Sequence, residues 1–126
     1  MAKVVLIIAA IIEFVFRGLP AFFGSEPVAE LFNLEYIEGA VPYVHAFGAV
    51  MLCFGVMLFI GARNPKENRL VVDMGILRFA LGVVAQLLTF AMMGSLHIFW
   101  WIHMVVDVVL VVLLLVSRRQ ISMQVA

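Results

Sequence analysis

His103 and Asp107 are the residues whose types and spacing most directly indicate chemistry. They lie four residues apart in HIFWWIHMVVDVVL, residues 97–110, inside an apolar run that continues through Val116. Residues at this spacing share one face of a helix, so Asp107 can orient or charge the His103 imidazole. A histidine beside a carboxylate exchanges protons near neutral pH, as a general acid or base does. This pair is therefore the candidate catalytic pair.

Other polar side chains also interrupt apolar stretches. Glu13 and Arg17 are four residues apart, and Arg78 lies in a separate apolar stretch. At a rise of about 1.5 Å per residue, Glu13, Arg78 and Asp107 fall at similar depths in membrane-spanning helices. Charges are costly there unless they pair or line a polar cavity, and these two acids and two arginines cancel. The candidate ligand-binding residues are Glu13, Arg17, His45, Arg78 and Gln86.

The same residues also have a purely structural interpretation. Polar side chains between membrane helices hold the helices together, and each contributes about 0.6 kcal/mol. A neutral set of charges fits this role as well as it fits a ligand, ion or proton site. The sequence leaves both interpretations open.

Composition identifies the solvent around these residues as lipid. The chain has 126 residues, 66% of them hydrophobic and 13% charged, with a mean hydropathy of +1.19. A soluble domain of this size needs more polar surface than that. A net charge of zero without a dense basic run argues against nucleic acid as a partner, and a single cysteine excludes an intrachain disulfide.

Four apolar runs have the length of about 20 residues that a bilayer crossing requires. They cover approximately residues 4–22, 43–62, 70–93 and 96–117. Because backbone groups must be satisfied internally in lipid, we expect an all-α membrane protein. The predicted fold is a four-transmembrane-helix bundle forming a single domain over residues 1–126.

The connections between these runs contain residues that are typical of turns and helix caps. Residues 63–69 form a short polar turn, and Gly94-Ser95 predicts a tight reversal. The stretch SEPVAELFNL predicts a short helix at the membrane surface, with Ser25 as its cap and Pro27 in its first turn. Gly48 and Gly55, seven residues apart, predict a close helix approach.

Charge outside the spans predicts the orientation. The N-terminus, the second connection and the C-terminus carry Lys and Arg, whereas the first and third connections carry none. The positive-inside rule therefore predicts a multi-pass protein of the cell inner (plasma) membrane with both termini cytoplasmic. Glu13 and Arg17 directly follow the stretch VVLIIAAII, and no small-residue cleavage motif comes next, so we expect a span rather than a removed signal peptide.

The polar residues narrow the chemistry without identifying a ligand. His97 and His103 are six residues apart and face different ways on a helix, so we expect no metal site and no haem. A quinone or another lipid suits a site that opens sideways to the bilayer. The first hypothesis is an accessory or lipophilic-ligand-binding protein; the alternative is a quinone-linked oxidoreductase subunit or membrane isomerase with His103 and Asp107 as proton shuttle. Expected partners are membrane lipids and either a second copy or another membrane subunit.

The segment HAFGAVMLCFGVMLFIGARNP, residues 45–65, resembles the second helix and following turn of the DoxX-like family of small bacterial membrane proteins. The loop GSEPVAELFNL and the apolar fourth run are similar to the family in layout. His45 stands where the family carries an arginine, so no family role is transferred to this position. The resemblance implies a four-helix inner-membrane protein, with some relatives acting as subunits of quinone-reducing complexes and others assisting the assembly of membrane proteins.

Overall fold

The computed structural model describes residues 1–125, which form helices joined by short turns. Four helical stretches are long and apolar enough to cross a membrane: Ala2–Phe22, Glu38–Gly61, Arg69–Met93 and Ile98–Gln124. The all-α fold class and the four predicted spans are thereby confirmed. Large apolar side chains are exposed along all four helices, as expected for helices whose outer faces meet lipid.

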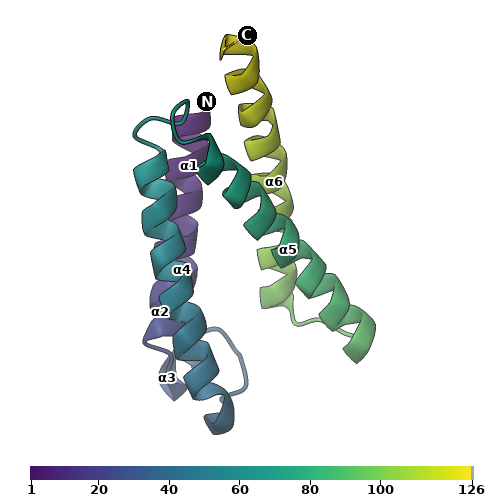
Figure 1. Cartoon of the computed structure of the whole chain (residues 1–126). Coiled ribbons are helices and arrows are strands. Elements are labelled where there is room, and N and C mark those ends of the chain that lie inside the picture. Colours follow the sequence, from purple (N-terminus) through teal and green to yellow (C-terminus); the bar gives the residue numbers. More distant parts are fainter. Residues whose placement is uncertain (126) are drawn as a thin grey trace. The chain divides into compact units, whose positions relative to one another are not determined.

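The chain forms two compact units (Figure 1). One unit combines Met1–Leu6 with the chain from Gly61 to the C-terminus, and the other comprises Ile7–Ile60. The first unit contains α5 (Arg69–Met93) and α6 (Ile98–Val125); the second contains α4 (Val41–Gly61) and most of the first span.

The first span changes its helical type midway. It begins as α1 (Ala2–Ile11), widens into the π-helix η1 (Ile12–Gly18) and ends as α2 (Leu19–Phe22). The widened segment carries both Glu13 and Arg17. A π-helix is rare, and it is often found at functional positions.

Glycines bring α4 close to the first span within the second unit. A Cβ atom at Gly48 would lie 2.6 Å from the backbone carbonyl carbon of Ala21, and one at Gly55 would lie 2.8 Å from Phe14 Cβ. The first span contributes Gly18, where a Cβ atom would lie 2.8 Å from Leu52 Cδ2. The predicted close approach at Gly48 and Gly55 is confirmed, because side chains at these positions would force the two helices apart.

The connection to α4 contains the predicted short helix, α3 (Glu26–Leu31), and then a 3-10 turn, η2 (Glu38–Ala40). Pro27 lies in the first turn of α3, as expected. Ser25 occupies the cap position with extended backbone, but its side chain makes no capping hydrogen bond; its carbonyl oxygen accepts from the Ala29 amide instead. Ser25 is thus the N-cap residue, as predicted, but it caps without a side-chain hydrogen bond.

A tight turn joins α5 to α6 in the first unit. Gly94 has a left-handed φ of 71°, and its amide donates to the Phe90 carbonyl oxygen, so the predicted reversal is confirmed. Buried positions recur three and four residues apart on each helix, as in antiparallel coiled-coil packing. They are Val72, Gly75 and Phe79 on α5, and Asp107, Leu110, Leu114, Ser117 and Ile121 on α6.

The fourth helix is longer than its apolar run. The apolar residues end near residue 117, yet α6 continues through Val125. Arg118 and Ser122 keep the helical register, and Ser122 Oγ donates to the Arg118 carbonyl oxygen. Long polar side chains at the end of a span can reach water or headgroups, so helix and apolar core need not end together.

Candidate functional site

Glu13 and Arg17 form a buried ion pair in the π-helix of the second unit. Arg17 Nη1 donates to Glu13 Oε1 at 2.7 Å, and the two side chains are 3% and 0% exposed. A buried charge is tolerated in an apolar surrounding only when it has such a partner. This pair supplies two of the predicted ligand-binding residues, and each already engages the other.

Arg78 and Asp107 meet over Gly82 in the first unit. A Cβ atom at Gly82 would lie 3.1 Å from Arg78 Nη1 and 3.3 Å from Asp107 Cγ, and it would clash with Asp107 Oδ2. The guanidinium and the carboxylate thus occupy the space that a side chain at this position would fill. Asp107 is 3% exposed, whereas Arg78 is half-buried. Opposite charges from α5 and α6 therefore lie side by side at one level of the hairpin.

Gln86 and His103 lie one helical turn further toward the Gly94 turn. Gln86 follows Gly82 by four residues and His103 precedes Asp107 by four, so the antiparallel hairpin places them at one level. Both side chains are half-buried. We call Arg78, Gly82, Gln86, His103 and Asp107 the hairpin site. Its composition offers a charge pair at one level, and an amide and an imidazole at the next.

Aromatic rings border the hairpin site at its end nearer the Gly94 turn. The His103 ring lies against Phe99, with centroids 4.4 Å apart, and against Trp100 at 5.7 Å. Phe90 and Trp101 meet edge-on across the hairpin, with centroids 5.6 Å apart. These rings form an apolar, partly aromatic border next to the imidazole, in which a flat ring can pack.

His45 belongs to the other unit and not to the α5–α6 hairpin. Its Nε2 donates to the Gly24 carbonyl oxygen at 2.8 Å, and the side chain is exposed. This contact joins the first turns of α4 to the turn that follows the first span. It gives His45 a local structural contact at the predicted ligand-binding position.

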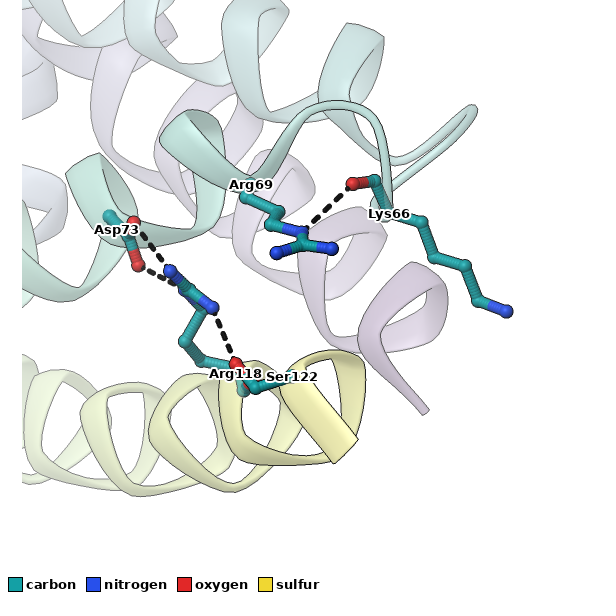
Figure 2. A network of polar contacts seen from close by, with 5 residues as sticks. All are labelled: Lys66, Arg69, Asp73, Arg118 and Ser122. Carbon is teal, nitrogen blue, oxygen red and sulfur yellow. Dashed lines mark hydrogen bonds and ion pairs between the residues drawn. The ribbon is translucent and has the colours of Figure 1, made fainter. Parts of the chain in front are cut away.

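A second charge pair joins α5 and α6 near the opposite end of the hairpin (Figure 2). Arg118 donates from Nε to Asp73 Oδ1 at 2.6 Å and from Nη2 to Asp73 Oδ2 at 3.3 Å. Its remaining nitrogen, Nη1, donates to Ser122 Oγ at 2.7 Å. The two-pronged contact fixes the register of the hairpin from which the hairpin site is built.

A family model, "Domain of unknown function (DUF4345)", matches residues 1–117 and so covers all four spans up to the polar end of α6. The chain belongs to the DUF4345 family. Neither curated proteins nor solved structures match this DUF4345 chain significantly. The family model identifies a family without an assigned activity, and the resemblance to the DoxX-like group stays an expectation.

The DUF4345 chain carries two site features that the sequence reasoning missed. Gly82 was overlooked, although its spacing of four from Arg78 and Gln86 places all three on one helix face. Asp73 was overlooked because it lies at the edge of an apolar run, where a charge is unremarkable. Asp73 could have been recognised from Arg118, which has the opposite charge and lies about as many residues after the Gly94 turn as Asp73 lies before it.

Proposed function

We propose that this DUF4345 protein binds a lipid-soluble small molecule, with the ligand's polar head group in the hairpin site. The observation that carries the proposal is the space at Gly82. The missing side chain leaves room there for the Arg78 guanidinium and the Asp107 carboxylate. A glycine there lets a charge pair sit between two helices, and the next turn adds the Gln86 amide and the His103 imidazole. Such a cluster at membrane depth is by default a functional-site hypothesis.

The chemistry of the hairpin site favours a ligand with a carbonyl or hydroxyl group on a flat ring. The Gln86 amide and the His103 imidazole can each donate to or accept from such a group. The Phe99 and Trp100 rings near His103 provide an apolar surface for the ring itself. A quinone combines these properties with solubility in the bilayer. Lipid access is supported by the half-buried state of Gln86 and His103.

Tryptophan fluorescence provides a direct test. Trp100 and Trp101, the chain's two tryptophans, both lie within three residues of His103. Titration of the purified protein in detergent with a short-chain ubiquinone analogue should therefore give saturable quenching. Gln86→Leu should raise the Kd about fivefold, because it removes roughly 1 kcal/mol of hydrogen bonding.

A matched variant separates binding from partitioning into micelles. Thr89→Val has a comparable loss of polarity on α5, but the Thr89 hydroxyl already donates to the Ala85 carbonyl oxygen of its own helix. It should leave the Kd unchanged. Linear quenching without saturation, or equal Kd values for Gln86→Leu and Thr89→Val, would rule out the hairpin site as a quinone site.

Proton transfer by His103 is the second candidate function. Its support is the spacing of His103 and Asp107 on one face of α6, at the site where a carbonyl ligand would lie. The position of Asp107 beside Arg78 argues for binding over catalysis, because that carboxylate already faces a cation. His103→Gln should keep quenching by the quinone analogue while abolishing any turnover, and retained turnover would exclude this role.

The expected setting is the inner membrane, where the protein acts as an accessory protein with a second copy or another membrane subunit. Four candidate spans support a multi-pass protein, and the basic residues at the N-terminus, the second connection and the C-terminus support cytoplasmic termini. A fluorescent protein fused to the C-terminus should fold and emit. A phosphatase that is active only in the periplasm, fused at the same position instead, should be inactive; phosphatase activity would contradict this orientation.

A further inference from the structure

A small cavity lies at the polar end of the first unit, away from the hairpin site. It has a volume of about 150 Å³ and lies where the first turn of α1, the turn before α5 and the last turns of α6 meet. Its polar lining comes from Lys3, Lys66, Ser117, Gln120 and Gln124. All of these belong to one unit of the chain. They come from three separate segments of the sequence.

The lining is cationic and rich in hydrogen-bond donors. Among the described residues that line the cavity, none is acidic. Within residues 1–125, no carboxylate pairs with Lys3 or Lys66. Figure 2 shows the Lys66 side chain extending away from the Asp73–Arg118 pair, which neutralises the nearest acid on α5.

Two glutamines of α6 supply neutral donors to the same cavity. Gln120 and Gln124 are four residues apart, and they share a face of α6 that continues from the buried Ser117 and Ile121. The Ser117 hydroxyl donates to the Leu113 carbonyl oxygen, so its own oxygen can accept but its proton is already used. The donors that remain for a ligand are two ammonium groups and two amides.

We propose that this cavity binds a phosphate monoester or diester group. Phosphate presents acceptor oxygens in several directions, which suits donors from three segments, and lysine is a common point-charge partner for it. The cavity lies past the apolar runs, at the level of lipid headgroups, where basic pockets between membrane helices recognise anionic lipids. The phosphate can come from an anionic phospholipid or from a soluble phosphate ester.

Native mass spectrometry of the full chain in detergent tests the proposal. Phosphatidylglycerol should remain bound at one molecule per chain, whereas zwitterionic phosphatidylcholine should not. Each lysine contributes about fivefold to the affinity, so the combined Lys3→Gln and Lys66→Gln variant should lose about 30-fold. The combined Arg63→Gln and Arg119→Gln variant removes the same charge outside the cavity and should keep the bound lipid.

Two further arms give the result its meaning. Gln120→Leu with Gln124→Leu keeps the net charge and should still weaken retention about tenfold, since two neutral donors are lost. Glycerol 3-phosphate distinguishes the sources: displacement of phosphatidylglycerol assigns the cavity to the phosphate group alone, and no displacement assigns it to the lipid headgroup. Circular dichroism monitors folding of each variant. Equal losses in the cavity and control variants, or equal retention of phosphatidylcholine, would overturn the proposal.

Discussion

Gly48→Ala provides the sharpest test of how the second unit packs. A Cβ atom at Gly48 would lie 2.6 Å from both the Ala21 carbonyl carbon and Phe22 Cα. Carbon atoms in contact prefer about 3.5 Å or more, so α4 and the end of the first span must separate locally by roughly 1 Å. The obstructing atoms are backbone, which cannot move aside by a change of rotamer.

The magnitude follows from two opposing effects. Overpacking costs about 1 to 3 kcal/mol, and a backbone obstacle places Gly48→Ala at the upper end. The gain in helix propensity on replacing glycine by alanine offsets up to about 1 kcal/mol of this. A net loss of roughly 2 kcal/mol in the free energy of unfolding is therefore expected.

Equilibrium unfolding in mixed micelles, with helicity followed as SDS is added, measures this loss. Gly39→Ala is the control, because nothing lies within 4 Å of its added Cβ atom. Gly55→Ala should be milder than Gly48→Ala, because its nearest obstacle, Phe14 Cβ at 2.8 Å, is further away than the Ala21 and Phe22 backbone atoms that face Gly48. Equal stability of Gly48→Ala and Gly39→Ala would refute the close packing of α4 on the first span.

Three other substitutions have defined outcomes. Asp107→Leu should lower the free energy of unfolding by about 3 kcal/mol, because it leaves Arg78 without its neighbouring carboxylate. Adding Arg78→Leu should restore much of this loss. A double-mutant cycle measures the coupling, and strictly additive losses would contradict it. Glu13→Leu should lower the free energy of unfolding by about 3 to 5 kcal/mol, because it leaves the buried Arg17 without its carboxylate partner. Glu13→Leu with Arg17→Met should lose clearly less stability in SDS titration. A larger loss in the double variant would contradict the ion pair. Gly94→Ala should cost about 1 kcal/mol from its left-handed backbone alone, since nothing lies within 4 Å of the added Cβ atom, and an unchanged unfolding midpoint would contradict this turn.

The elements that the sequence predicted are those governed by hydropathy and by glycine. The four spans follow from the length of the apolar runs, and the Gly94 turn and the Gly48 and Gly55 contacts follow from what a missing side chain permits. The π-helix was not predictable, because one wider turn leaves the apolar composition of Ile12–Gly18 unchanged. The ion pair between Glu13 and Arg17 gives no signal for the π-helix either, because residues four apart also share a face in an ordinary α-helix.

The sequence pointed to most residues of the hairpin site, but it did not predict how they are arranged. Arg78, Gln86, His103 and Asp107 were all selected as polar interruptions, but spacing along one helix cannot tell which residue of another helix lies opposite. That depends on the hairpin register, which the Gly94 turn and the Asp73–Arg118 contact fix. The length of α6 was underestimated because apolar composition ends before helical structure does.

Lipid extraction of the purified protein, followed by mass spectrometry, tests the central claim most directly. The hairpin site predicts one carbonyl- or hydroxyl-bearing lipophile enriched over the surrounding membrane lipids. Its amount should fall about fivefold in Gln86→Leu and stay unchanged in Gly39→Ala. An extract with the same composition as the bulk membrane, in the parent protein and in both variants, would contradict a ligand site in the α5–α6 hairpin.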